Sequence, residues 1–255
     1  MTLGLPLSTL HAFLLVLART AGLVAFLPFP GFRGAPDKLR AVLALALTFS
    51  LLPVWPSLPD TPVSMATLVA WAIAEAGFGL AAGVAIGLLT DAFQLAMQIL
   101  GLQAGYGYAT TIDPTSQADA STLQVVTMLV TGLLLFTLGI DRELFRILAA
   151  SFEAFPPGSW APATASAEGI VRLGSFMFSL ALRMAMPVIA LLLLIDLALA
   201  LLGRMQQQLQ LLSLAFPVKM LAALAVLAAL APTFVHLFES SAARALDVLW
   251  RGLGR

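Results

Sequence analysis

Apolar residues follow one another in long runs along this chain and do not alternate with polar ones. Runs without a charged residue cover residues 41–59, 92–112, 120–140 and 220–238. Each is close to the ~20 residues that a helix needs to cross a bilayer. The pattern predicts an all-α membrane protein, a single domain over residues 1–255, with about six to eight apolar helices arranged in helical hairpins.

Proline clusters and charged turns divide these runs into separate helices. We expect helices at about residues 5–29, 39–52, 120–140, 169–203 and 211–238, with Pro187 and Pro217 kinking or breaking the last two. A charged patch after residue 140 and a Pro-, Ser- and Ala-rich stretch to about residue 167 predict a loop.

The apolar segment 63–104 is too long for a single ordinary crossing. As one helix it would measure roughly 60 Å, about twice the hydrocarbon thickness of a bilayer. It is therefore either a hairpin or a helix that leaves the membrane. Basic residues near 33–40 and at the C-terminus both favour the cytoplasm. Five simple spans between them would place them on opposite sides, and a hairpin within 63–104 would restore the parity.

Composition excludes several classes of function. The chain is 60% hydrophobic and only 10% charged, and its formal net charge is zero. A nucleic-acid partner is not expected without a basic surface. The absence of cysteine excludes disulfides and thiolate metal ligands. His11 and His236 are isolated, and no hydrolase, metalloprotease or phosphate-loop motif is present. We expect no enzyme activity, no metal and no cofactor.

Charged residues nevertheless occur inside the apolar runs. Each would cost about 2.5–3.5 kcal/mol at a bilayer centre on insertion scales. They indicate ion pairs or snorkelling near helix ends, or a proton path, or an assembly in which these helices do not face lipid. A secondary transporter with Glu75, Asp91 and Asp196 as a proton relay is the alternative function. The charges expected to be buried are Arg19, Arg183, Asp196, Arg204 and Lys219.

Three glycines flanked by two acids recur at every fourth position in the middle of the long segment. The row consists of Glu75, Gly79, Gly83, Gly87 and Asp91. Rows of this kind allow helix backbones to approach closely in membranes. A glycine-rich membrane helix also produces such spacings by chance. We interpret the row as a helix-packing face, with a neighbouring subunit as its expected partner.

The segment "GLQAGYGYATTIDPTSQ" (residues 101–117) differs from its surroundings. It contains three glycines, an Asp-Pro step and the only two tyrosines of the chain. Glycines allow the backbone to change conformation, and tyrosine tolerates both wet and dry surroundings. Taken alone, these tyrosines indicate an aromatic belt at the membrane interface.

Four segments in order resemble the FliR family of the flagellar type III export gate, whose virulence counterpart is SctT. They are "RTAGLVAFLPFPGFRGAPDKLRAVLALALT" (19–48), "EAGFGLAAGVAIGL" (75–88), "GLQAGYGYATTIDPTS" (101–116) and "PVIALLLLIDLALALLGRMQQQLQLLSLAFPVKM" (187–220). The residues of the third segment resemble the flagellar branch of the family more than the virulence branch. Gln206, Gln207 and Gln208 depart from the Pro-Gln-Met-Asn pattern that the family usually shows after the arginine.

The resemblance implies a non-enzymatic component of a protein channel. One FliR-like copy joins FliP-like and FliQ-like subunits in a helically wound assembly of the bacterial inner membrane and flagellar basal body. FlhB-like and FlhA-like proteins, membrane lipid and unfolded substrate proteins are the other implied partners. The segment at about 105–118 is implied to act as a channel plug. Its expected residues are Gly105, Tyr106, Gly107, Tyr108, Ile112, Asp113 and Pro114.

The C-terminal residues 239–255 predict an amphipathic helix. Leu246, Leu249, Trp250 and Leu253 fall on one face. The arginines of this tail favour a cytoplasmic position. The face either lies on lipid with Trp250 at the headgroups or meets an FlhB-like partner.

Overall fold

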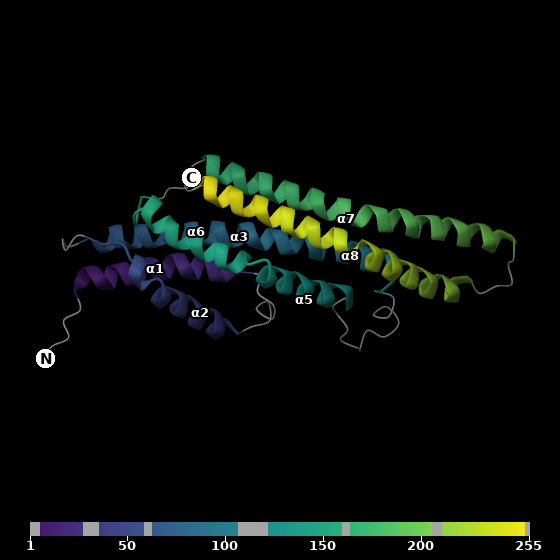
Figure 1. The fold of residues 1–255 in the computed structure, drawn as a ribbon, viewed down its shortest axis with the longest axis horizontal. Helices are drawn as coiled ribbons and strands as arrows, with labels where there is room; N and C mark the ends of the chain where they lie inside the picture. The colour runs from purple at the N-terminus through teal and green to yellow at the C-terminus, as the bar shows by residue number, and fades with distance from the viewer. Residues whose placement is uncertain are drawn as a thin grey trace. The chain divides into compact units, whose positions relative to one another are not determined.

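The computed structural model describes residues 6–27, 36–58, 63–106, 122–159, 164–205 and 211–252. Within these ranges the chain forms seven α-helices and one short 3-10 turn, and no strand. Figure 1 shows the helices in chain order from α1 to α8. The predicted all-α class and number of helices are confirmed.

Prolines mark the starts of the first two helices. Helix α1 (Leu7–Phe26) follows Pro6, and α2 (Asp37–Ser50) follows Pro36. Proline disfavours helical conformation in the residue before it and its own ring fits the beginning of a helix. The two helices are joined by a hydrogen bond of 2.8 Å between the buried hydroxyls of Thr20 and Thr48. A 3-10 turn (Leu52–Val54) follows α2.

Helix α3 (Met65–Ala104) runs through the whole long segment as 40 continuous residues. The hairpin expected as one alternative for residues 63–104 is therefore wrong. The segment contains no proline within the helix, and its glycines are held by packing. At the C-terminal end, Gly105 adopts a positive φ of 86°, a conformation that suits glycine. Its N–H donates to the Leu102 carbonyl and that of Tyr106 donates to the Gly101 carbonyl, which closes the helix.

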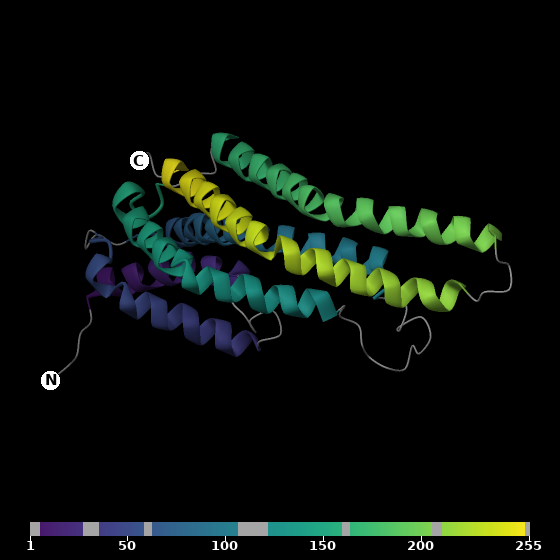
Figure 2. The ribbon, with the colours of Figure 1, turned by 45° about the vertical axis from the view of Figure 1, so that its right-hand side comes forward.

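Helices α5 (Thr122–Thr137) and α6 (Ile140–Ala154) meet at a bend of 61°. The bend, visible in Figure 2, lies at Gly139, whose φ is +68°. The loop predicted after residue 140 is thus wrong over α6. Arg142 and Arg146 are exposed on one side of this helix, while the opposite side is buried and mostly apolar. The buried side consists of Ile140, Leu144, Ile147, Leu148, Ser151 and Phe152.

Helices α7 (Thr164–Met205) and α8 (Leu211–Gly252) complete the chain. Pro187 lies inside α7, and Pro217 and Pro232 lie inside α8, so no proline ends a helix here. Helix α8 also includes residues 239–252 of the stretch that the sequence assigned to a separate C-terminal helix, and the rest of that stretch lies outside the described residues. Four helices (α1, α3, α7 and α8) are long and apolar enough to cross a membrane, and the bent pair α5–α6 makes a fifth span if counted once. This is the make-up of a multi-pass membrane protein.

The chain divides into two compact units. The first comprises residues 1–89, 135–174 and 241–255, and the second comprises residues 90–134 and 175–240. Helices α3, α7 and α8 each contribute a segment to both. The second unit has an apolar cluster built on Leu100, Ala104, Leu123, Val188 and Leu192.

Candidate functional site

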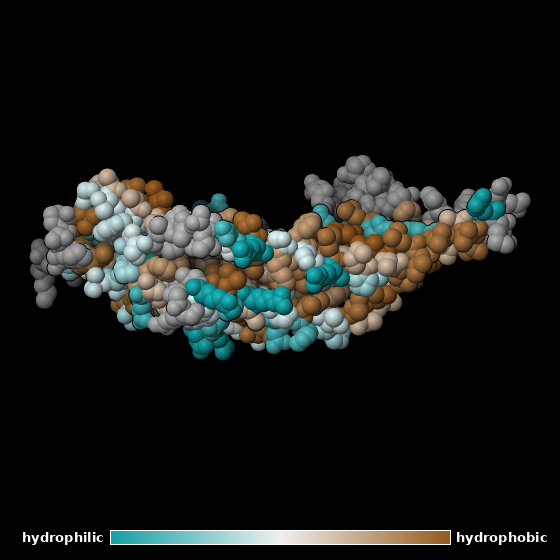
Figure 3. Space-filling view, turned by 90° about the horizontal axis from the view of Figure 1, so that it is seen from above, coloured by the Kyte–Doolittle hydropathy of each residue, from teal (hydrophilic) through white to brown (hydrophobic). Residues whose placement is uncertain are grey.

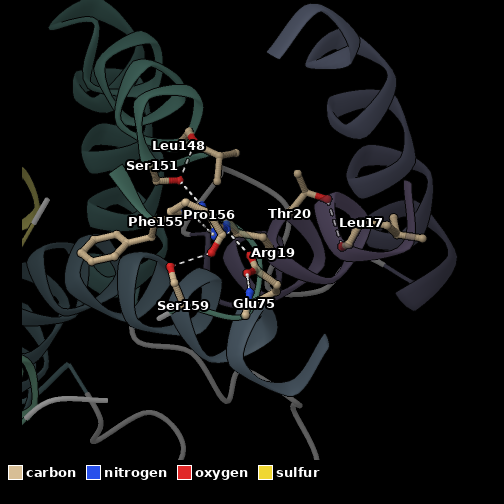
Figure 4. Close-up of polar contacts among 10 residues, drawn as sticks. Leu17, Arg19, Thr20, Glu75, Leu148, Ser151, Phe155, Pro156 and Ser159 are labelled. Carbon is tan, nitrogen blue, oxygen red and sulfur yellow. Dashed lines mark hydrogen bonds and ion pairs between the residues drawn. The ribbon is translucent and has the colours of Figure 1, made fainter. Parts of the chain in front are cut away.

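The first unit contains a fully buried ion pair between α1 and α3. The Nε of Arg19 lies 2.5 Å from Oε2 of Glu75, and both side chains are 0% exposed. Figure 4 shows the guanidinium between Glu75 and the end of α6. Such a pair is stable only if further hydrogen bonds satisfy the remaining polar atoms.

Those further bonds come from α6 and from the turn that follows it. Arg19 Nη1 donates to Ser151 Oγ at 2.7 Å, and Nη2 donates to the Phe155 carbonyl at 3.2 Å. The backbone N–H of Gly158 donates to Glu75 Oε1 at 3.1 Å. The pair therefore fixes α1, α3, α6 and residues 155–158 to one another. We call this group the Arg19 centre.

Two aromatic rings enclose the guanidinium. Its Cζ lies 4.9 Å from the ring centroid of Phe78 and 4.2 Å from that of Phe152. An aromatic face attracts a cation electrostatically, and the attraction strengthens when water is excluded. The Arg19 centre is thus closed to solvent and holds the helices together, and its two charges are paired with each other.

The row of glycines on α3 lies against α1 of the same chain. A Cβ added at Gly79 would overlap the carbonyl oxygen of Arg19 and approach the Leu23 nitrogen at 2.8 Å. At Gly83 it would meet the Leu23 carbonyl oxygen at 2.6 Å, and at Gly87 the Phe26 carbonyl oxygen at 3.3 Å. Along this row the glycines contact α1 of the same chain, where the sequence had indicated a neighbouring subunit.

Helix α1 supplies the matching glycine. A Cβ at Gly22 would overlap the carbonyl oxygen of Ala76 and approach the Leu80 nitrogen at 2.9 Å. Glycines on both helices allow the backbones to touch, because no side chain separates them. The close approach also brings Arg19 and Glu75 within reach of each other. Asp91, at the far end of the row, is exposed.

The second unit holds another ion pair inside apolar helices. Lys219 Nζ of α8 lies 3.0 Å from the carboxylate of Asp196 of α7. The Lys219 side chain is 12% exposed and that of Asp196 is 41% exposed. The pair joins α7 to α8 and neutralises both charges locally.

Two of the charges expected to be buried are not. Arg183 and Arg204 are both exposed on α7. Neither forms an ion pair with another residue in the described parts of the chain. Position within an apolar run does not determine which side of a helix a residue occupies, and that is why the prediction failed for these two.

The start of the expected plug segment is packed into the second unit. The Phe216 ring lies where a Cβ of Gly105 would be, at 2.5 Å from its Cδ1. The hydroxyl of Tyr106 donates to the Met220 carbonyl at 3.3 Å, and burial raises the pKa of Tyr106. The other expected plug residues, Gly107, Tyr108, Ile112, Asp113 and Pro114, lie outside the described residues.

The apolar face of the C-terminal tail packs inside the first unit. Leu246, Leu249 and Trp250 of α8 lie against Phe78 and Ile147. The indole N–H of Trp250 donates to Glu143 Oε1 at 3.1 Å. Within this chain these three partly buried side chains are covered in part by α3 and α6, and Leu253, the fourth residue of the predicted face, lies outside the described residues.

The tail contact predicts a moderate loss of stability for Trp250→Ala. Full truncation of a buried Trp costs about 3–5 kcal/mol. Because Trp250 is only half-buried, we expect roughly half of that loss, measured as a lower thermal midpoint in detergent. Trp250→Phe, which keeps an aromatic ring but loses the hydrogen bond and part of the indole's contact area, should cost less than Trp250→Ala, with about 1 kcal/mol of its loss coming from the hydrogen bond. Equal losses for both variants would show that packing contributes nothing.

The sequence did not predict three partners of the Arg19 centre. Ser151, Phe155 and Gly158 fall in the stretch interpreted as a loop. The helical spacing of Leu144, Ile147 and Leu148 is the signal that identifies α6 and would have placed Ser151 on its buried side.

Comparisons with known proteins identify the family of this chain. The family model described as "Bacterial export proteins, family 1" matches residues 10–245. The chain is 30% identical to the flagellar biosynthetic protein FliR of Escherichia coli (strain K12), over 91% of this chain and 90% of that protein. It is 26% identical to FliR of Pectobacterium carotovorum subsp. carotovorum, over 91% and 88%, and 30% identical to FliR of Bacillus subtilis (strain 168), over 82% and 81%. The chain therefore belongs to the bacterial export proteins, family 1.

Proposed function

We propose that this chain is a non-enzymatic subunit of the flagellar type III export gate in the bacterial inner membrane. Its role is to help form and seal the channel through which unfolded flagellar proteins leave the cytoplasm. The names of its relatives support the flagellar assignment. The proposed neighbours are FliP-like and FliQ-like subunits, with FlhB-like and FlhA-like proteins next to the assembly.

Uncovered apolar surface on α7 and α8 is the observation that carries the proposal. In an apolar 18-residue stretch of each helix, only 17% is buried in α7 and 11% in α8, against 44% in α1 and 50% in α3. Large exposed apolar patches mark surfaces that meet membrane or protein. The uncovered surface therefore supports the proposal that the chain works inside a larger membrane assembly.

The buried carboxylates favour this reading over a secondary transporter. A proton relay needs carboxylates that gain and lose protons during transport. Glu75 is closed off by Arg19, and Asp196 is paired with Lys219. Of the three carboxylates in the alternative relay, these two serve as joints between helices.

A plug between α3 and α5 is the second part of the proposal. Tyr106 at its start and Leu123 after its end belong to the same apolar cluster of the second unit. The glycines and tyrosines of that segment suit a seal that must give way to a passing chain.

Deletion of residues 107–118 tests the plug. This deletion keeps Gly105 and Tyr106, whose contacts belong to the second unit. We expect the complex to assemble and the membrane to become permeable to small ions, measured as ion flux in cells that produce the variant. Recovery of the assembled complex is the control. Normal impermeability with an assembled complex would contradict the plug.

The C-terminus is proposed to face the cytoplasm. Helix α2 has 14 residues, short of the ~20 needed to cross. Without it, four candidate spans separate the basic residues Lys38 and Arg40 from the tail, if the bent pair counts once. An even number places both on the same side, as the positive-inside tendency requires.

A single cysteine at Gly254 tests this side directly, since the native chain has no thiol. We expect a membrane-impermeant maleimide to leave Gly254→Cys unlabelled in intact spheroplasts and to label it once the membrane is opened. The native chain controls for background. Labelling in intact spheroplasts would place the tail outside.

A further inference from the structure

We infer, on the basis of the proposed plug, that Phe216 and Met220 of α8 are positioning residues that hold the start of the plug in place. They do so through two contacts with the C-terminal end of α3, at Gly105 and Tyr106. Tyr106 and Met220 are 114 positions apart in the sequence, so the contacts join distant parts of the chain. Loss of either contact is expected to make the assembled complex leak ions.

One face of α8 is directed at the end of α3. Phe216, Met220 and Ala223 follow at steps of four and three, which places them within an arc of about 60° on a helix. Ala223 is fully buried in the same apolar cluster as Leu100 and Ala104 of α3. This face of α8 therefore extends from the core of the second unit to the contacts at the end of α3.

Gly105 lies against the Phe216 ring at a position where only glycine fits. Its φ of +86° favours glycine. An added Cβ would also lie 2.5 Å from Cδ1 and 3.0 Å from Cε1 of Phe216, and the first of these is too close for any real contact. The backbone conformation and the ring both require glycine, so α8 determines the direction in which the chain leaves α3.

The Tyr106 hydroxyl bonds to the main chain of α8. It donates to the Met220 carbonyl at 3.3 Å, while the Tyr106 ring packs on the apolar cluster. The surface is predominantly apolar where α8 begins, in the right-hand part of Figure 3. A hydrogen bond that breaks in apolar surroundings is poorly replaced by water. Tyr106 is therefore held against α8 by its polar end as well as by its ring.

The turn of α8 that makes these contacts is itself joined to α7. Lys219, next to Met220, lies 3.0 Å from the carboxylate of Asp196, and the Lys219 side chain is only 12% exposed. This ion pair keeps the first turns of α8 in one place relative to α7. The start of the plug thus rests on a fixed support within the second unit.

Tyr106→Phe tests the hydrogen bond, because it removes the hydroxyl and keeps the ring. A net hydrogen bond shifts an equilibrium by roughly fivefold. We expect ion flux in cells that produce the variant to rise by about that factor, with unchanged recovery of the assembled complex. Thr131→Val is the matched control, since the Thr131 hydroxyl donates to the Thr127 carbonyl of its own helix at 2.7 Å in the same unit. Its ion flux should stay at the native level.

Gly105→Ala tests the ring contact, with Gly139→Ala as its control. Both glycines have a positive φ, +86° and +68°, so alanine strains both backbones. An added Cβ at Gly139 meets no atom within 4 Å. Only Gly105→Ala should therefore leak. Phe216→Val removes the ring atoms nearest to the added Cβ, and the double variant should leak no more than Phe216→Val alone, because both changes act at one contact.

The deletion of residues 107–118, measured in the same assay, distinguishes the positioning role from the plug itself. Native ion flux in Tyr106→Phe and Gly105→Ala beside a leaking deletion would overturn the positioning role and leave the plug in place. An equal leak in Thr131→Val or Gly139→Ala, or a leak that rises only as the complex is lost, would overturn it as well. An impermeable deletion would contradict the plug, and the positioning role with it.

Discussion

Glu75→Gln is expected to destabilise the first unit by about 3–5 kcal/mol, the cost of removing one partner from a buried ion pair. The substitution keeps the shape of the side chain and removes only its charge. Arg19 would remain 0% exposed, with neutral acceptors and two aromatic rings around a full positive charge. A loss of this size is a large fraction of the ~5–15 kcal/mol that holds a typical domain folded. It should appear as a lower thermal midpoint and poorer recovery of monodisperse protein in detergent.

Glu168→Gln is the matched control for this effect. It makes the same chemical change in a pair with Arg172, where the side chains are 66% and 83% exposed and 3.6 Å apart. Exposed pairs of this kind contribute about 0–1 kcal/mol. The thermal midpoint should hardly change.

A second substitution tests whether the unpaired charge of Arg19 causes the loss of stability. Adding Arg19→Met to Glu75→Gln removes the unpaired cation, and we expect it to recover part of the stability. Recovery would be incomplete, because Ser151 Oγ and the Phe155 carbonyl lose their donor. A double variant less stable than Glu75→Gln alone would show that the uncompensated charge is not the cause.

Gly79→Ala is expected to destabilise the chain although alanine is the better helix former. On propensity alone, the change would stabilise an exposed helix by about 1 kcal/mol. Here the added Cβ overlaps the carbonyl oxygen of Arg19, so α1 and α3 must move apart. Overpacking of this kind costs about 1–3 kcal/mol. The same movement would also lengthen the ion pair between Arg19 and Glu75, which adds to the loss.

Gly174→Ala should have the opposite sign. It makes the same change in α7, where the nearest atom to an added Cβ is Leu88 Cδ1 at 3.9 Å, an ordinary contact. Thermal midpoints of the two variants in detergent give the comparison. If Gly79→Ala were as stable as Gly174→Ala, the close contact between α1 and α3 would be wrong.

The class of protein and most helices could be predicted because they depend on local composition. A bilayer requires about 20 apolar residues in a row, and such runs are visible without any partner. The α6 region was misread because its charges are frequent, whereas helix formation there depends on one buried side. The helix predicted at residues 39–52 corresponds to α2, but counting it among the five spans was wrong, because its 14 residues are too few to cross a bilayer.

Partnerships between distant residues could not be predicted from spacing alone. The glycine row indicated a close helix contact, and nothing in its spacing distinguishes α1 from another subunit. Glu75 and Arg19 are 56 positions apart, and Asp196 and Lys219 are 23 apart. The exposure of Arg183 and Arg204 depends on which side of α7 packs on α8. That packing is a tertiary contact, and composition alone does not predict it.

The native mass of the purified assembly tests the central claim most directly, that the chain functions as one subunit of a multi-protein export gate. The full chain would be produced with its neighbouring export proteins, purified through an affinity tag and measured in detergent by native mass spectrometry. The account predicts a hetero-oligomer containing a single copy of this chain together with several copies of smaller membrane subunits. A stable 26.8 kDa monomer without partners, transporting a small solute when reconstituted in vesicles, would contradict it.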